Sequence, residues 1–342
     1  MKTIIVHHRS SHHAKNSGYG RLTSYLNAQI IYGSTKFPFR IAKIFAKLYS
    51  KNKGDFNVGS LLKIIELYQL LNKTRGQKNI VHFLNGERDI RHLGFLKRRF
   101  PDTYFCATFH KPPGVLKKTI TKVSALKKLD GVITVGTNQV EFIKEWLQLE
   151  NVVFIPHGVD TLFFVPNTSK IEKNNLLFVG QHLRDFDAFN YCIPKIAKRI
   201  NDLEVNVIIH PAYINKIHSH KCIKKYSNIS DKELLDYYHK ASLFFLPLSD
   251  VTACNSLLEA LSCGLPIITT DVGGNMEYLK NTNNILAPSK DRDYLIEATI
   301  ELLNNDDKQL QLQKSSREKA LDFDWKKVTK QITGFYSSLQ NK

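Results

Sequence analysis

The chain has 342 residues, 42% of them hydrophobic, which is enough for two domain cores, and its apolar runs are too short for a transmembrane helix or a signal peptide. Its five scattered cysteines form no Cys-x-x-Cys pair, which favours a reducing cytosol and speaks against disulfides or structural zinc. The net charge of +18 is uneven, since residues 1–155 carry +17 and residues 156–342 carry +1, so a polyanion or an anionic membrane surface is expected to meet the first half of the chain.

The N-terminus predicts a strand followed by a polar loop. Residues 3–6 are apolar and β-branched, and the loop after them contains Gly18 and Gly20 before a predicted helix that runs through Ile31. His12 and His13 lie in this loop without acids or cysteines at metal-ligand spacing, so we expect a solvated loop that binds no metal.

Residues 36–53 predict a basic amphipathic helix, because apolar residues recur at helical spacing with cations between them. Such a helix either packs its apolar face into the core or meets a membrane or polyanion. No acid occurs before Asp55, which favours the second alternative. The cations are Lys36, Arg40, Lys43, Lys47 and Lys51, and the apolar residues are Phe37, Ile41, Ile44, Phe45 and Leu48.

Further strands are predicted at 80–84, 103–110 and 131–135. His110 is the last residue of the second of them. In the second half of the chain, residues 176–180 predict another strand, and Arg184 is the only cation close behind it. Ser230 and Glu233 predict a capping box at the start of a helix.

The stretch from Phe244 to Glu277 predicts a β-α-β unit. Two short apolar runs, 243–248 and 265–270, are typical of buried parallel strands, and the helix between them is closed by Gly264 and Pro266. In open α/β sheets ligands bind outside the carboxyl ends of the strands, where helix N-termini favour phosphate groups.

Two details of this unit have alternative interpretations. Glu259 either binds a ligand or joins Ser256, three residues before it, in a capping box. Gly273 and Gly274 form either a plain turn or, with Glu277 opening the next helix, a turn that lets a phosphate approach the backbone.

The same unit resembles the donor-binding signature of the retaining glycosyltransferases of the GT-B fold, which include sucrose synthases and bacterial polysaccharide and lipid glycosyltransferases. Val251 stands where the family has its first Glu, and residues 155–160 resemble its interdomain segment with His157 in place of Asn. The matching residues are Glu259, Ala260, Cys263, Gly264, Pro266, Asp271, Gly273 and Gly274.

The resemblance implies an α/β GT-B fold, with two Rossmann-like domains facing each other across a cleft and a C-terminal helix crossing back. The implied divisions are an acceptor-side domain at 1–155, a nucleotide-sugar-binding domain at 156–322 and the returning helix at 323–342.

The resemblance also implies roles for individual residues. Glu259 would hold the donor ribose, and Arg184 would grip the diphosphate in place of the family's usual cations, whose positions are Gln181 and Phe186 here. His110 would face the cleft from the first domain and act in catalysis together with Arg184. The other implied donor-binding residues are Gly18, Gly20, Thr252, Asn255, Ser256, Gly273 and Gly274.

The expected function is retaining transfer of a sugar from a UDP- or GDP-sugar to a glycan or lipid-linked glycan in cell-surface polysaccharide synthesis. The expected location is the cytoplasm, peripheral on the inner face of the membrane, with no nucleic-acid partner and no cofactor. No metal is expected, because the three Asp-x-Asp matches at 185–187, 291–293 and 322–324 are attributed to chance. The alternatives are a non-catalytic polyanion-binding protein on the same scaffold and a nucleotide-sugar epimerase.

Overall fold

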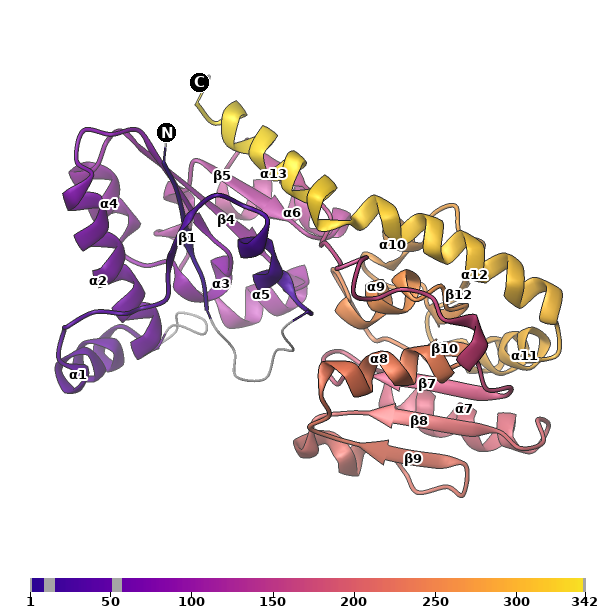
Figure 1. Ribbon diagram of the computed structural model, residues 1–342. Coiled ribbons are helices and arrows are strands. Elements are labelled where there is room, and N and C mark those ends of the chain that lie inside the picture. Colours follow the sequence, from indigo (N-terminus) through magenta and orange to yellow (C-terminus); the bar gives the residue numbers. More distant parts are fainter. Residues whose placement is uncertain (1, 9–15, 51–56, 341–342) are drawn as a thin grey trace. The chain divides into compact units, whose positions relative to one another are not determined.

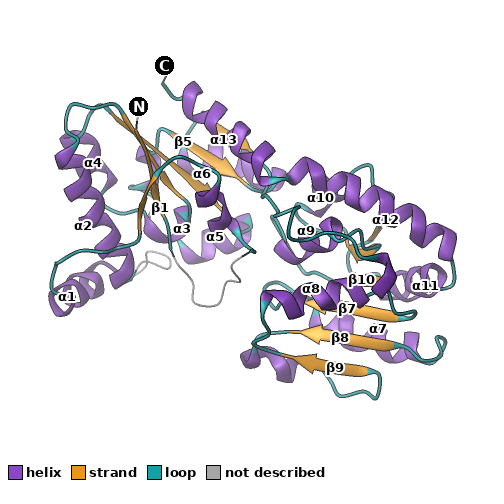
Figure 2. Cartoon of the chain, viewed as in Figure 1, coloured by secondary structure: helices purple, strands orange, loops and turns teal. Residues whose placement is uncertain are grey.

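The computed structural model contains two six-stranded β-sheets, each made of parallel strands and flanked by helices (Figure 1 and Figure 2). It describes residues 2–8, 16–50 and 57–340, without the side chains of residues 48–50. The described residues divide into a first unit, formed by 2–8, 19–157 and 326–340, and a second unit, formed by 16–18 and 158–325. The α/β class with parallel sheets, predicted from the sequence, is confirmed.

The first unit contains a sheet with the strand order β2-β1-β3-β4-β5-β6. All five residues of β3 are buried, as expected for a parallel strand covered on both faces by helices. The strands are β1 (Lys2–Val6), β2 (Gln29–Ile31), β3 (Asn79–Phe83), β4 (Thr103–Phe109), β5 (Gly131–Thr134) and β6 (Val152–Phe154). The α-helices are α1 (Phe39–Ser50), α2 (Val58–Lys73), α3 (Gly86–Asp89), α4 (Leu93–Arg99), α5 (Pro113–Thr119), α6 (Val140–Leu147) and α13 (Trp325–Ser338).

The predicted helix through Ile31 is wrong. The chain forms a short 3-10 helix over Tyr19–Ser24 and then the edge strand β2, in which Ile31 pairs with Val6 and is buried. Thr23, Ser24, Tyr25 and Asn27 are weak helix formers, while the β-branched pair Ile30 and Ile31 fits a strand beside β1.

The C-terminal helix α13 lies against the first sheet although it directly follows the last element of the second unit. A Cβ atom on Gly131 in β5 would stand 2.6 Å from the Phe335 ring and 2.8 Å from Leu339. Glycine at this position therefore lets the helix approach the strand closely.

The second unit contains a sheet with the strand order β12-β11-β10-β7-β8-β9. The strands are β7 (Asn175–Val179), β8 (Glu204–Ile208), β9 (Ile223–Tyr226), β10 (Leu243–Leu246), β11 (Ile267–Thr270) and β12 (Ile285–Ala287). The α-helices are α7 (Phe186–Ala197), α8 (Asp231–Lys240), α9 (Asn255–Ser262), α10 (Asn275–Leu279), α11 (Arg292–Leu303) and α12 (Asp306–Ala320).

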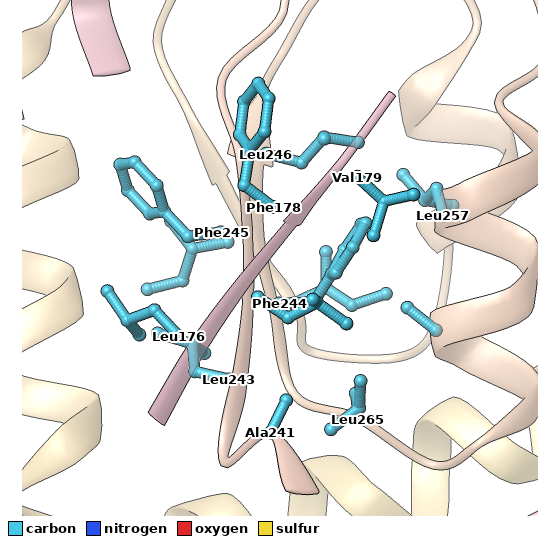
Figure 3. Close-up of a cluster of buried hydrophobic side chains, with 14 of the residues drawn as sticks. Leu176, Phe178, Val179, Ala241, Leu243, Phe244, Phe245, Leu246, Leu257 and Leu265 are labelled. Carbon is cyan, nitrogen blue, oxygen red and sulfur yellow. The ribbon is translucent and has the colours of Figure 1, made fainter. Parts of the chain in front are cut away.

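The core of this unit is built on the central strands β7 and β10. Figure 3 shows Phe178, Phe244 and Phe245 among the aliphatic side chains of these strands, and all three rings are fully buried. Burying three aromatic rings stabilises the sheet centre by roughly 2–3 kcal/mol each. The centre of the sheet therefore gives the loops at the strand ends a rigid base.

Among the described residues, no helix is both long and apolar enough to span a bilayer.

Candidate active site

The carboxyl ends of β7, β10 and β11 meet at one edge of the second sheet, because these strands are parallel neighbours. The loops that follow them carry most of the predicted site residues. Gly180 follows β7 in a left-handed conformation (φ +93°), the loop 247–254 follows β10, and Gly273 and Gly274 follow β11. Helix α9 begins in this group of loops, with its free N–H groups at the same edge.

Arg184 lies beside the first turn of α9. Its Nε and Nη2 atoms donate to the carbonyl oxygen of Val179 (3.0 and 2.8 Å), and Nη1 donates to that of His182 (3.0 Å). Nη2 also donates to Ser256 Oγ on α9 (2.9 Å). A Cβ atom on Gly180 would stand 2.6 Å from Nη2, so only glycine leaves room for the guanidinium. The guanidinium of Arg184 therefore lies beside the positive N-terminal end of the α9 dipole, and the two together favour a negatively charged group.

Glu259 is 4% exposed and accepts hydrogen bonds from two hydroxyl groups. Tyr238 donates to its Oε2 (2.8 Å) and Ser17 donates to its Oε1. Burial raises the pKa of this carboxyl, although the two hydroxyl donors act in the opposite direction. A buried carboxylate that already receives hydroxyl donors suits the hydroxyls of a ribose.

The capping interpretation of Glu259 is wrong. Helix α9 begins at Asn255 with Cys254 as its N-cap, so Ser256 already lies inside the first turn, and no side chain caps the helix. Both oxygens of Glu259 point to Tyr238 and Ser17 instead.

The glycine pair after β11 packs against the loop after β10. A Cβ atom on Gly273 would stand 1.9 Å from the carbonyl oxygen of Val251, and one on Gly274 would stand 2.2 Å from that of Thr252. The Gly274 N–H donates to Val251 (2.9 Å), and Gly273 has a left-handed φ of +54°. These glycines are therefore required for the contact between the two loops, while their approach to a phosphate stays a prediction.

The residue before the missing acid is itself an acid that sequence reasoning overlooked. Val251 is buried, whereas Asp250 is half-buried and its Oδ1 accepts the Val251 N–H (2.7 Å). The same Oδ1 lies 2.9 Å from the Cβ position of Gly273, which places a carboxylate at the contact of the two loops. Its place directly before position 251 is the signal that could have identified it.

Thr252 is buried and Asn255, the first residue of α9, is half-buried.

The first unit contains a second group of polar side chains, around the end of β4. His110 directly follows β4, and its Nε2 bonds the carbonyl oxygen of Leu84 (2.7 Å). The ring of Tyr19 contacts His110 and His157 edge-on, with centroids 4.7 and 5.2 Å away. His110 is thus fixed at the predicted strand end, and its catalytic role stays a prediction.

A buried chain of hydrogen bonds continues from Tyr19 into α13. The Tyr19 hydroxyl bonds Thr108 Oγ1 (3.2 Å), Thr108 bonds His82 Nε2 (2.8 Å), and His82 Nδ1 bonds the Tyr336 hydroxyl (2.6 Å). Burial lowers the pKa of His82 to about 3, so its ring stays neutral. Sequence reasoning missed this chain, because its members are far apart in the sequence.

Two predicted donor-binding glycines lie in the N-terminal part of the chain. Gly18 has a left-handed φ of +81°, and a Cβ atom on Gly20 would stand 2.7 Å from the His7 ring. Gly18 thus needs glycine for its backbone conformation, and Gly20 leaves room for the His7 ring, while the contact of both with a donor stays a prediction.

The predicted apolar stripe is divided. Phe37, just before α1, is partly buried against Ala42 and Ala46, whereas most of the large apolar side chains of α1 are exposed. Ala42 and Ala46 face α2 and are buried, whereas Ile41, Ile44 and Phe45 are 44%, 64% and 46% exposed. The predicted cations Lys36, Arg40, Lys43 and Lys47 are exposed beside them, while Lys51 and the side chain of Leu48 lie outside the described residues. We call the side chains of Phe39, Arg40, Ile41, Lys43, Ile44, Phe45 and Lys47 the α1 face.

Within the described part of the chain, no three His, Cys, Asp or Glu side chains are grouped so that they could hold a metal ion.

Residues 173–305, which make up most of the second unit, match the family described as glycosyl transferases group 1. An uncharacterized glycosyltransferase of Haemophilus influenzae is 22% identical over 232 residues, which cover 64% of this chain. They also cover 64% of that protein, so the chain spans slightly less than two thirds of this relative.

Solved structures of known glycosyltransferases share the fold of this chain. The sucrose-phosphate synthase of Thermosynechococcus elongatus has a TM-score of 0.71 at 14% identity, with 100% of both chains covered. HepE of Anabaena, solved in complex with UDP and glucose, has a TM-score of 0.67 at 14% identity, with 99% of this chain and 100% of that chain covered. The fold is that of the GT-B glycosyltransferases.

Proposed function

We propose that this protein is a retaining, metal-independent glycosyltransferase that uses a nucleotide diphosphate sugar. The observation that carries the proposal is the pairing of Arg184 with the first turn of α9, one helical turn before the buried Glu259. A fixed cation and a ribose-binding carboxylate at one sheet edge are what a nucleoside diphosphate requires.

The chemistry follows from charge. When the bond between the sugar and the diphosphate breaks, negative charge grows on the departing oxygen. Arg184 and the N–H groups of α9 would stabilise this charge without a metal, since they are already oriented towards the site. Asp250 would contact the donor sugar in place of the acid that Val251 replaces, and His110 would contribute to catalysis from the first unit.

Nucleotide binding is the direct test. UDP, GDP and ADP are titrated calorimetrically in the presence of EDTA. UDP is tested first, because HepE was solved with UDP. We expect one nucleoside diphosphate to bind without metal with a dissociation constant below about 1 mM, the upper end of common KM values. Binding of none of the three, or binding that EDTA abolishes, would refute the proposal.

Product analysis tests the stereochemistry. The nucleotide that binds is supplied as a panel of its sugar derivatives, and the anomeric configuration of the transferred or hydrolysed sugar is followed by NMR. Retention is expected. A product of inverted configuration would contradict the retaining mechanism, and an isomerised nucleotide sugar would indicate the epimerase alternative.

The α1 face supports a second part of the proposal, a membrane-bound acceptor. Four large apolar side chains of this face, Phe39, Ile41, Ile44 and Phe45, are exposed among cations on one helix. A helix of this kind lies in the interfacial region of a membrane, and nearby lysines are attracted to anionic lipids by about 1 kcal/mol each. We therefore place the enzyme on the inner face of the cytoplasmic membrane, with a lipid-linked glycan as acceptor in cell-surface polysaccharide synthesis.

A further inference from the structure

The second unit contains a cavity of about 350 Å³ at the amino ends of its strands, the edge opposite Arg184. One wall is the segment 166–171, which leads into β7. The others are the end of α8 with Tyr238, the turn 263–265 before β11, and one face of α12. Its volume lies within the range of small-ligand sites. We call it the rear cavity.

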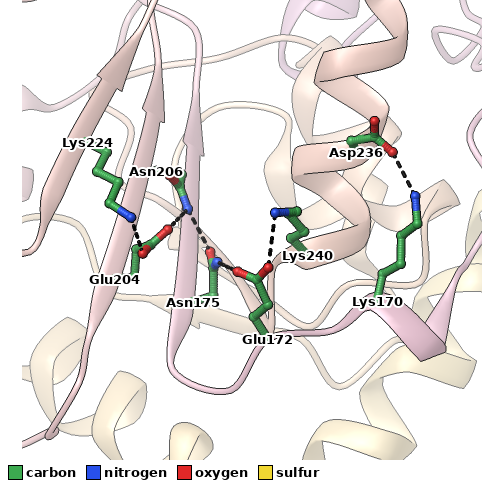
Figure 4. A network of polar contacts seen from close by, with 8 residues as sticks. All are labelled: Lys170, Glu172, Asn175, Glu204, Asn206, Lys224, Asp236 and Lys240. Carbon is green, nitrogen blue, oxygen red and sulfur yellow. Dashed lines mark hydrogen bonds and ion pairs between the residues drawn. The ribbon is translucent and has the colours of Figure 1, made fainter.

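The walls of the rear cavity are held in place by the fold. The Glu172 N–H donates to the carbonyl oxygen of Lys240 at the end of α8 (2.8 Å). Ion pairs Lys170–Asp236 (3.0 Å) and Glu172–Lys240 (3.1 Å) connect the same segment to α8 (Figure 4). Such exposed ion pairs contribute little on their own. Together with the backbone bond, they fix the segment 170–172 against α8.

Arg317 connects α12 to the rest of the cavity wall. Its Nη1 donates to the carbonyl oxygens of Phe164 (3.0 Å) and Ser262 (2.8 Å), and its Nη2 donates to that of Thr161 (3.0 Å). These bonds connect α12 to residues 161–164 and to the last residue of α9, Ser262. The rear cavity is therefore preformed, which lowers the cost of binding.

The lining of the rear cavity selects a ligand by its chemistry. Tyr238 and Leu265 are apolar wall residues that are almost fully buried, and Leu310 at the α12 side is 51% exposed. Lys314 and Arg317 add two positive charges to this lining, and Glu318 adds one negative charge. The lining thus fits a small molecule with an apolar body and one carboxylate.

Tyr238 connects the rear cavity to the candidate active site. Its ring belongs to the cavity wall, while its hydroxyl donates to Glu259 Oε2 (2.8 Å) and to the Ser256 carbonyl oxygen (3.2 Å). Ser256 and Glu259 both lie on α9, and Ser256 also contacts Arg184. A ligand that displaces the ring of Tyr238 therefore changes the surroundings of Glu259.

We propose that the rear cavity binds a small apolar carboxylate and that its occupancy changes the affinity of the nucleotide site. The second half of this statement depends on the proposed function, whereas the first half does not. The coupling needs no long path, since Tyr238 lines the cavity and bonds Glu259 directly.

Binding is tested with 3-phenylpropionate, its neutral analogue 3-phenylpropanol and its cationic analogue 3-phenylpropylamine, each titrated calorimetrically into the full chain. We expect the carboxylate to bind at least about tenfold more tightly than the amine, which corresponds to 1.4 kcal/mol. No heat of binding from the carboxylate, or equal affinity for all three probes, would overturn the proposal.

Variants locate the binding. Lys314→Glu should weaken 3-phenylpropionate severalfold and leave 3-phenylpropanol unchanged, while Lys198→Glu, an exposed change directly after α7, should affect neither. Leu310→Trp should obstruct the cavity for all three probes, whereas Gln311→Trp, an exposed change on the same helix, should not. Probe affinity that is unchanged in Lys314→Glu and Leu310→Trp would show that the probe binds elsewhere.

The coupling is measured as UDP affinity with and without saturating 3-phenylpropionate. A change of severalfold is expected in the wild type, and Tyr238→Phe should abolish this change while it still binds the probe. Unchanged UDP affinity in the wild type would overturn the coupling. If UDP does not bind, the coupling is measured with GDP or ADP in its place. If none of the three binds, the proposed function fails and the coupling fails with it, and the probe titration still decides whether the rear cavity binds a carboxylate.

Discussion

Single residues show how local context decides the meaning of a motif. Ser230 and Glu233 form the predicted capping box, with the Ser230 N–H donating to Glu233 (2.7 Å) and the Glu233 N–H donating to Ser230 Oγ (3.3 Å). Ser256 and Glu259 have the same spacing and do not form one, because α9 begins one residue before the serine. The spacing alone could not distinguish the two cases, because it does not show at which residue the helix begins.

Glu259→Gln should weaken binding of the nucleoside diphosphate by roughly 1–3 kcal/mol, the range for a hydrogen bond to a charged group. The amide retains the size of the side chain and one acceptor, so the fold should persist. Calorimetric titration measures the change, with Glu301→Gln on the exposed face of α11 as the control. An unchanged affinity would show that Glu259 does not bind the ribose.

The raised pKa of Glu259 predicts a pH effect on stability. Burial keeps a proton on the native carboxyl at pH values where the unfolded chain, with a pKa of 4.5, has released it. The contribution of this group to the free energy of unfolding therefore falls as the pH rises from 4.5 through the raised native pKa. Glu259→Gln cannot ionise, so its stability relative to the wild type should increase over this range. Urea unfolding at several pH values checks this, and a difference independent of pH would contradict it.

Arg184→Ala should weaken UDP much more than uridine, because the guanidinium is proposed to contact the diphosphate and not the nucleoside. Loss of its bonds to Val179 and Ser256 should also lower stability, so both ligands are titrated into the same folded preparation. Arg199→Ala, which removes an exposed cation of the same unit, is the control. Equal losses for UDP and uridine would show that Arg184 has only a structural role.

At the scale of elements, strands were easier to predict than the residues that contact across them. The β-α-β unit around α9 was predicted because its apolar runs, capping glycine and helix formers are all local. The bonds of Arg184 to Ser256 and of Tyr238 to Glu259 depend on how these elements pack, which no local pattern encodes. The helix predicted through Ile31 failed for the same reason, since pairing with β1 decides that strand.

Helix α13 provides a test of such a distant contact. Tyr336→Phe removes the hydroxyl that bonds His82 Nδ1 (2.6 Å) and leaves a buried ring nitrogen without this partner. An unsatisfied buried group costs about 1–3 kcal/mol, so the free energy of unfolding should fall by that amount. Urea unfolding measures it, with Tyr294→Phe, a change at a 46% exposed ring, as the control. Equal stability of the two variants would mean that the bond contributes nothing.

On the scale of the whole molecule, the uneven charge and the α1 face point to the same partner. The sequence places +17 of the +18 net charge in residues 1–155, and the structure exposes the cations of α1 beside large apolar side chains. Charge alone would attract any polyanion, since it acts over a distance of about 10 Å at moderate ionic strength. Apolar exposure adds a requirement that a soluble polyanion does not meet and an anionic membrane does, namely an interface that accepts Ile44 and Phe45.

Peripheral binding to anionic vesicles should therefore need both parts of the α1 face. Sedimentation with phosphatidylglycerol vesicles should retain the protein at low salt and release it at high salt, because each lysine contributes about 1 kcal/mol near such a surface. Lys43→Glu with Lys47→Glu, and separately Ile44→Ser with Phe45→Ser, should abolish binding. Lys198→Glu with Lys232→Glu makes the same charge change at exposed positions of the second unit and should not. Binding that persists in both α1 variants would exclude this surface. If only the charge variant loses vesicle binding, and the wild type binds a soluble anionic polysaccharide as well as it binds vesicles, the acceptor is a polymer and not a lipid-linked glycan.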